Sequence, residues 1–358
     1  MTELKDHLKE MLSTSGLPGN EGPIRSIIEK AWSPFTDELS TSKLGNLYGL
    51  KKGRAKSPRK SVLIATHMDA IGLIVNSIEN EFMFVAAVGG IDARVLPGQM
   101  VTVHGSEDIP GMVIVPPEHT LPESAKGNIV GVTNLLIDTG YSASEIAKKV
   151  QVGDLVSFAN EPIEFEGGYV TGHSLDNRAS VAVLTETLCL LDKRKHEWDL
   201  WAVATSQEEL HIKGAGTAGY EINPSIAVVV DVNFAVGTGT PGYIKEKIGK
   251  GPTMDWGANT NPKMFKQFVE LAEKLEIPFQ KTIYERHSGT DAFALQVSRE
   301  GIPTMMLSIP IRNMHTAVEM VNIKDIMRSA RLLTEFISQL DDSFMDKINW
   351  GNSAGKDN

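Results

Sequence analysis

The sequence lacks several features that would place it in common protein classes. It has one cysteine in 358 residues, which excludes a disulfide framework and a zinc site built from thiolates. Its apolar runs are about five residues long, far short of the ~20 needed to span a bilayer, so we expect no membrane segment. Lys and Arg number 35 against 45 Asp and Glu, and the net charge of −10 argues against a nucleic-acid-binding protein.

The N-terminal segment also lacks the pattern of a secretory signal. Residues 1–7 are charged and lead into a helical pattern, without an apolar core and a cleavage site. At roughly 100–200 residues per domain, a chain of 358 residues corresponds to two domains or to one domain with a large insertion. We therefore expect a cytoplasmic protein in which His and carboxylate side chains hold any metal ion.

Two kinds of pattern alternate along the chain. Before residue 70 and after residue 168, short apolar runs alternate with helical stripes, which is typical of an α/β domain. Residues 70–168 instead hold short β-like runs separated by Gly and Pro, with one short helix at 144–150, which predicts a small barrel or sandwich. The sequence thus predicts an α/β domain, residues 1–69 and 169–358, interrupted by an all-β insert. Its main predicted strands are 61–65, 200–205, 226–230 and 304–309, and its main helices are 179–191, 262–275 and 323–340.

Candidate metal ligands stand at the ends of four predicted strands. In open α/β sheets the site forms at the carboxyl ends of the strands, so side chains at these positions are expected to meet. The candidates are His67 with Asp69, Glu208 with Glu209, Asp231, His315, and Asp176 just ahead of the helix at 179–191. Nitrogen and oxygen ligands without sulfur suit Zn²⁺, Co²⁺ or Mn²⁺.

Two imidazoles and three carboxylates can hold two metal ions, with one carboxylate shared. Two ions ~3.5–4 Å apart stabilise both the attacking and the leaving oxygen and lower the pKa of a shared water towards ~7. Of Glu208 and Glu209, one would bind metal and the other would carry the proton of the water to the leaving group. Other interpretations stay open at this point: an acidic pair on a solvated surface, structural histidines, and Asp176 as a helix cap.

Seven short motifs follow one another in a distinctive order. They are Thr66–Gly72, Leu96–Gln99, Ser174–Arg178, Gln207–Glu209, Val230–Val232, Gly289–Ala292 and Ile309–His315. In this order they resemble the tetrahedral aminopeptidases, a family of di-metal metallopeptidases (peptidase family forty-two) that includes glutamyl aminopeptidase and cellulase M-like proteins. The resemblance covers roughly residues 5–340.

The resemblance implies a fold, a reaction and an assembly. The fold would be a phosphorylase/hydrolase-like, three-layer α/β/α catalytic domain with a mixed sheet, interrupted by a barrel-like dimerisation insert at residues 70–168. The chain would be a metallo-aminopeptidase that holds two divalent ions per subunit and removes N-terminal residues from peptides. Dimers would assemble into a hollow dodecamer, although a dimer alone is also open.

The resemblance also implies a role for each candidate residue. His67 and Asp231 would hold one ion, Glu209 and His315 the other, and Asp176 would bridge both. The general base would be Glu208. A further role falls to Asp69, which would orient the imidazole of His67, as metal-bound histidines usually require.

Several departures from the family pattern leave the substrate preference open. Ala70 stands where the family often has Glu, and Leu210-His211 replaces the usual Val-Gly. His211, His287 and Arg312 could line the specificity pocket, or each could be a structural hydrogen-bonding residue.

Two further questions stay open at the level of the sequence. Asp291 could be a carboxylate near His315 or a helix cap, and we favour the former. The alternatives to an aminopeptidase are a two-metal hydrolase of acylated amino acids or other amides, and a non-catalytic assembly relative.

Overall fold

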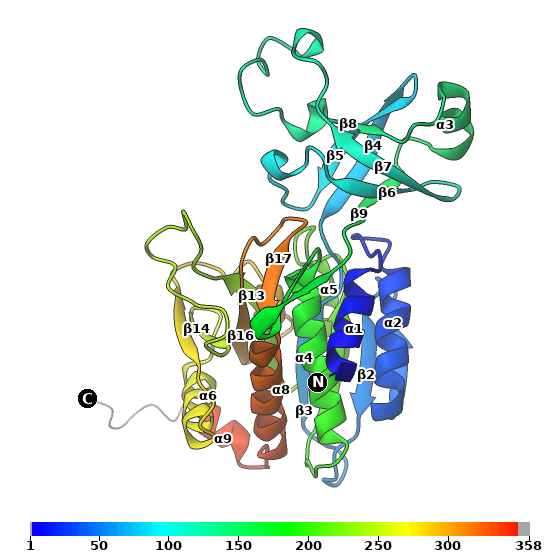
Figure 1. Ribbon diagram of the computed structural model, residues 1–358. Coiled ribbons are helices and arrows are strands. Elements are labelled where there is room, and N and C mark those ends of the chain that lie inside the picture. Colours follow the sequence, from blue (N-terminus) through cyan, green and yellow to red (C-terminus); the bar gives the residue numbers. More distant parts are fainter. Residues whose placement is uncertain (1, 350–358) are drawn as a thin grey trace.

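The computed structural model describes residues 2–349 and shows an α/β body with a smaller β-rich unit at one end (Figure 1). The two units are joined by chain segments that leave the body after β3 and return to it after β9. No helix in the described part of the chain is both long enough and apolar enough to cross a bilayer.

An eight-stranded mixed sheet forms the centre of the body. In spatial order its strands are β1 (Glu38–Thr41), β2 (Leu47–Lys51), β12 (Asp199–Thr205), β3 (Ser61–His67), β13 (Ile226–Phe234), β16 (Thr304–Ile311), β14 (Thr253–Gly257) and β15 (Gln280–Tyr284). The four central strands β12, β3, β13 and β16 are parallel to one another. Their carboxyl ends therefore lie along the same edge of the sheet.

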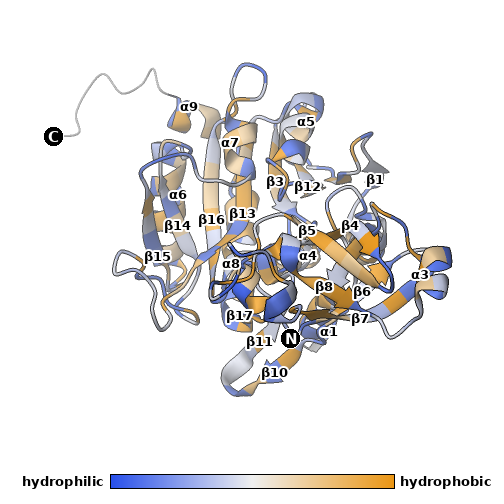
Figure 2. Ribbon diagram, turned by 90° about the horizontal axis from the view of Figure 1, so that it is seen from above, coloured by the Kyte–Doolittle hydropathy of each residue, from blue (hydrophilic) through white to orange (hydrophobic). Residues whose placement is uncertain are grey.

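Helices cover both faces of this sheet, which confirms the three-layer α/β/α fold. One face carries α1 (Thr2–Leu12), α2 (Gly22–Trp32), α4 (Leu175–Leu191), α6 (Pro262–Lys274), α8 (Ile323–Ser338) and α9 (Phe344–Ile348). The other face carries α5 (Lys213–Ile222) and α7 (Asp291–Gln296). Figure 2 shows both helices on the opposite side of the central strands from α4 and α8. Alternate residues of β3 enter the two cores, Val62 and Ile64 on the first face and Leu63 on the second, as the pleat requires.

The smaller unit contains a closed barrel, which confirms the barrel-like insert. Its strands, in order around the barrel, are β4 (Gly72–Glu79), β5 (Phe82–Val88), β8 (Leu136–Asp138), β7 (Asp108–Ile114), β6 (Met100–His104) and β9 (Leu155–Phe158). The short helix α3 (Ala143–Lys149) packs Ile146 into the barrel core. A closed barrel leaves no unpaired strand edge.

A small antiparallel sheet lies beside α4 and α8. It consists of β10 (Ile163–Phe165), β11 (Tyr169–Gly172) and β17 (Glu319–Asn322). Thus β10, which falls within the range predicted for the insert, pairs with β11 of the body, and β11 pairs with β17. The domain boundaries at 69/70 and 168/169 stay a prediction.

Candidate metal centre

The predicted ligands come together at the carboxyl edge of the parallel strands. They lie at the end of β3 (His67), in the turn after β12 (Glu208 and Glu209), in β13 (Asp231), in the loop after β16 (His315) and at the start of α4 (Asp176). Strand β13 continues to Phe234, so Asp231 lies inside the strand and not after it. The backbone of Asp176 and Asn177 is not helical, and the peptide bond between them is cis.

Asp176 lies between the two histidines. Its Oδ1 is 3.1 Å from Nε2 of His67, and its Oδ2 is 3.3 Å from Nε2 of His315. Each carboxylate oxygen therefore faces a different imidazole ring. A carboxylate with this orientation can give one oxygen to each of two neighbouring metal ions.

The other carboxylates gather around the two histidines. On one side, Oδ1 of Asp231 is 3.8 Å and Oε2 of Glu208 is 3.9 Å from Nε2 of His67. On the other side, Oε1 of Glu209 is 3.6 Å from Nε2 of His315. Ligand atoms of His67, Asp176 and Glu209 all lie within 4.8 Å of one another. Each side of Asp176 thus offers at least one imidazole and one carboxylate.

The donor atoms fit a divalent cation. Imidazole nitrogens and carboxylate oxygens without sulfur suit Zn²⁺, Co²⁺ or Mn²⁺, and buried carboxylates need a metal ion, a cationic partner or a proton. His67, Asp176, Glu208 and Asp231 are only 2–9% exposed. The side chain of His315 is 37% exposed, so the centre opens to solvent beside His315.

Burial raises the pKa of most carboxyl groups in the centre. It raises the pKa of Glu208 to about 10, that of Asp231 to about 8 and that of Glu209 to about 7, and neighbouring carboxylates add to each shift. Asp176 is the exception: hydrogen bonds from His315 and His67 outweigh its burial and lower its pKa. A bound cation would favour the ionised form of these carboxylates.

The Asp69 carboxylate holds the acidic turn after β12. Its Oδ1 accepts the N–H of Glu208 at 3.0 Å, and its Oδ2 accepts the N–H of Glu209 at 3.1 Å. Asp69 also faces the ring of His67, whose Nδ1 is 3.0 Å from the backbone carbonyl oxygen of Asp69. The Asp69 carboxylate lies farther from this nitrogen, at 3.8 Å. The direct hydrogen bonds of the Asp69 carboxylate therefore hold the backbone of Glu208 and Glu209.

Two side chains that the sequence analysis missed hold the same turn. Oε1 of Glu21 accepts the N–H of Gln207 at 3.1 Å, and Oδ1 of Asn46 accepts the N–H of Ser206 at 2.9 Å. Together with Asp69, these side chains satisfy the backbone N–H groups of residues 206–209. Glu21 and Asn46 lie far away in the sequence and in no recognisable motif, so no local signal marks their contact with the turn.

The loop after β5 brings the barrel unit against the centre. A Cβ atom at Gly90 would lie 3.0 Å from Nδ1 of His315, and one at Gly89 would lie 3.3 Å from Oε2 of Glu209. Gly89 also has a φ of +82°, a conformation that favours glycine. In the sequence this pair indicates only a turn between strands. In the structure it allows the backbone to approach two predicted ligands.

The remaining candidates lie around the centre or away from it. His211 and His287 are exposed, and the ring of His287 packs 5.7 Å from that of Phe293. Arg312 is half-buried and lies beside Gly237. Their roles in a substrate pocket stay predictions.

Asp291 does not take the position that we favoured. Its carboxylate accepts a hydrogen bond from the hydroxyl of Thr205 at 2.5 Å, at the end of β12. Its charge contributes to the raised pKa values of Glu208 and Asp231. Asp291 therefore lies on the Glu208 side of the centre and not beside His315.

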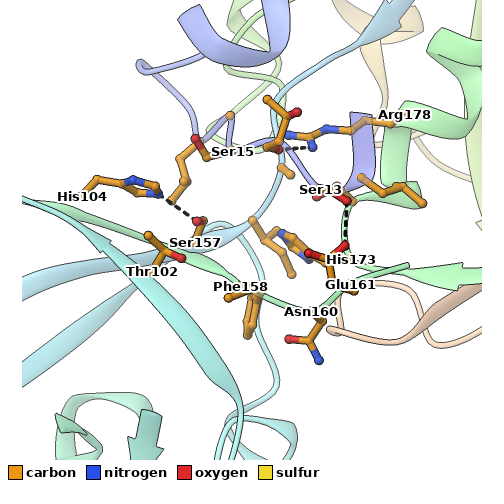
Figure 3. A pocket seen from close by; sticks show the side chains of 18 of the residues that line it. Ser13, Ser15, Thr102, His104, Ser157, Phe158, Asn160, Glu161, His173 and Arg178 are labelled. Atoms are coloured by element: carbon orange, nitrogen blue, oxygen red, sulfur yellow. Dashed lines mark hydrogen bonds between the residues drawn. The ribbon is translucent and has the colours of Figure 1, made fainter. Parts of the chain in front are cut away.

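A separate cavity of about 210 Å³ lies between the barrel and the loop that joins α1 to α2 (Figure 3). His104 and Ser157 of the barrel line it and are joined by a 2.8 Å hydrogen bond. Ser13 of the loop donates a hydrogen bond to Glu161 across it. Within the described part of the chain, none of the seven predicted site residues lines this cavity, so it is distinct from the metal centre.

Known proteins are similar to this chain in sequence and in fold. The M42 glutamyl aminopeptidase family matches residues 45–332. The chain belongs to this family. A lysyl aminopeptidase of Pyrococcus furiosus is 33% identical over 339 residues, which cover 93% of this chain and 96% of that protein. The M42 assignment confirms the family indicated by the seven motifs, and the chain is therefore a peptide hydrolase.

Two solved structures show how closely the fold of this M42 chain is shared. A TET aminopeptidase from a marine sediment Thaumarchaeota archaeon has a TM-score of 0.91 at 27% identity, covering 97% of this chain and 100% of that one. The TET1 peptidase of Pyrococcus horikoshii, which can assemble into a tetrahedron or a large octahedral shell, has a TM-score of 0.81 at 28% identity. That similarity covers 94% of this chain and 100% of the other.

Proposed function

We propose that this M42 peptidase is a di-metal aminopeptidase that removes N-terminal residues from peptides. The observation that carries the proposal is the position of Asp176, whose two oxygens face His67 and His315 separately. His67 and Asp231 would hold one ion, Glu209 and His315 would hold the other, and Asp176 would bridge them. Bound Zn²⁺, Co²⁺ or Mn²⁺ would polarise the scissile carbonyl and lower the pKa of a shared water.

Glu208 is the proposed general base. Its carboxyl group is 9% exposed and lies against His67, where burial raises its pKa to about 10. Nearby positive charge lowers the pKa of a carboxyl group, so two cations would bring that of Glu208 towards the range in which it can take up and release a proton. Glu208 would accept the proton of the attacking water and pass it to the leaving amine.

The comparisons favour a peptide substrate with a free N-terminus. The matching family is that of M42 glutamyl aminopeptidase, and the relative from Pyrococcus furiosus is a lysyl aminopeptidase. This similarity favours an aminopeptidase over a hydrolase of acylated amino acids.

We also propose that the chain assembles into homo-oligomers, with dimers that build a dodecamer. The support is the similarity to the TET1 peptidase, which can form a tetrahedron. Exposed apolar side chains on the barrel unit, among them Met100, Met112 and Ile129, offer contact surface for a partner subunit. A hollow assembly would admit peptides and exclude folded proteins. The cytoplasmic location expected from the sequence stays a prediction.

A peptide panel tests the proposed reaction. The protein is stripped of metal, reloaded with Zn²⁺, Co²⁺ or Mn²⁺, and assayed on aminoacyl-nitroanilides and on free and N-acetylated forms of the same peptides. We expect release of N-terminal residues that requires metal and is blocked by acetylation. Cleavage of the acetylated forms alone would support the acylated-amide hydrolase. Retention of metal with no cleavage of any substrate would support a non-catalytic relative.

A further inference from the structure

Glu319 contacts the backbones of two proposed metal ligands at once. It is the first residue of β17 and is only 1% exposed. Its Oε2 accepts the N–H of Asp176 at 3.0 Å, and its Oε1 accepts the N–H of His315 at 2.8 Å. One buried side chain therefore ties the start of α4 to the loop that follows β16.

The backbones of Asp176 and His315 lie outside regular helix and strand geometry. His315 lies in a loop and has a left-handed φ of +61°, and the backbone of Asp176 is not helical. His67 and Asp231, by contrast, lie within strands: His67 of β3 pairs with Thr205 of β12, and Asp231 of β13 pairs with Ser308 of β16. The contact with Glu319 thus supports His315 together with the carboxylate that is proposed to bridge the two ions.

The same two ligands also face each other through their side chains. Oδ2 of Asp176 is 3.3 Å from Nε2 of His315, and Oε1 of Glu209 is 3.6 Å from the same nitrogen. A shift between the backbones of Asp176 and His315 would change this spacing directly. Metal affinity depends strongly on ligand spacing, and loss of a supporting hydrogen-bond partner typically costs 10–100-fold.

We propose that Glu319 is a positioning residue that fixes Asp176 relative to His315 and so sets the affinity for the ion held by Glu209 and His315. The inference rests on the proposed di-metal centre. Glu319 needs both carboxylate oxygens for this role, because each one accepts a different backbone N–H. A glutamine offers one acceptor oxygen and an NH₂ group that cannot accept, so it can satisfy only one of the two ligands.

Metal titration of the Glu319→Gln variant tests this role. Metal-free wild-type and variant proteins are titrated with Zn²⁺ by calorimetry, and with Co²⁺ while its visible absorption is recorded. We expect the wild type to bind two ions. The variant should bind the ion held by Glu209 and His315 about 10–100-fold more weakly. The ion held by His67 and Asp231 should lose clearly less affinity, because only the shared carboxylate of Asp176 links it to Glu319. Excess metal should restore much of its turnover, and Glu319→Asp, which keeps both oxygens, should recover part of the lost affinity.

A matched control lies elsewhere in the fold. The buried carboxylate of Asp325 in α8 also accepts two backbone N–H groups, those of Gly249 at 2.5 Å and Gly251 at 2.8 Å. Asp325→Asn should lower the melting temperature in the same way as Glu319→Gln but leave both metal affinities unchanged. The pair of variants thus separates a loss of stability from a loss of ligand position.

Three outcomes would count against the proposals, and they are distinguishable. A wild type that binds fewer than two ions would contradict the di-metal centre itself. Two ions bound with wild-type affinity by Glu319→Gln would overturn the positioning role alone, as would equal weakening of both ions. If Glu319→Gln failed to fold, the Glu319→Asp variant would decide the question. In that variant, the ion held by Glu209 and His315 should lose more affinity than the other ion. Unchanged binding of both ions would overturn the positioning role of Glu319.

Discussion

Replacement of Glu208 by Gln is expected to lower turnover by roughly 10²–10⁴-fold while both ions stay bound. Gln has nearly the same shape as Glu but cannot take a proton from water. The acidic turn should keep its conformation, because Asp69 binds the backbone N–H groups of Glu208 and Glu209 and not their side chains. The loss should therefore appear in kcat and not in metal content.

Two measurements on the same preparation check this expectation. Turnover of an unblocked peptide gives kcat, and mass spectrometry of the digested protein gives the number of ions per chain. Glu118→Gln, an exposed position on the barrel unit, serves as the control for the loss of one negative charge. Turnover close to that of the wild type would end the role of Glu208 as general base. A loss of bound metal would make Glu208 a ligand.

Replacement of Asp176 by Ala is expected to remove both ions and all measurable activity. Asp176 faces His67 with one oxygen and His315 with the other, so its removal takes a ligand from each ion. It also leaves buried carboxylates of Glu208, Glu209 and Asp231 without a cation, and like charges in such a site then favour protonation. We expect each affinity to fall by more than the 10–100-fold that loss of an outer-shell partner costs.

The control for Asp176→Ala is His315→Ala, which removes a ligand from one proposed ion only. Metal titration should show one remaining ion in His315→Ala, near His67 and Asp231, and none in Asp176→Ala at the same free metal concentration. Circular dichroism checks that both variants are folded. Loss of a single ion in Asp176→Ala would show that Asp176 does not bridge.

The parts of the fold that the sequence predicted carry strong local signals. The apolar runs at 61–65 and 304–309 are long enough to mark strands buried on both faces, and they became β3 and β16. The helix predicted at 262–275 became α6, and a local signal marks its start: Oδ1 of Asn261 accepts the N–H groups of Lys263 and Met264. Parallel strands share one carboxyl edge, and this rule predicted that the candidates at the strand ends would meet.

The parts that the sequence analysis missed depend on distant contacts. Strand β17 is four residues long and pairs with β11, so neither its length nor its pattern marks it. The carboxylates of Glu21 and Glu319 look like surface charges in the sequence, but each is buried against backbone N–H groups near the centre. Gly89 and Gly90 indicate a turn equally well whether or not a ligand lies beside them. Such roles depend on contacts formed only in the tertiary structure, so no characteristic residue spacing marks them in the sequence.

Anomalous X-ray scattering from crystals of the Co²⁺-loaded protein, recorded at the cobalt absorption edge, tests the di-metal centre most directly. We expect two peaks that flank the carboxylate of Asp176, one in contact with His67 and Asp231 and the other with Glu209 and His315. A single peak, or two peaks that do not share Asp176, would contradict it.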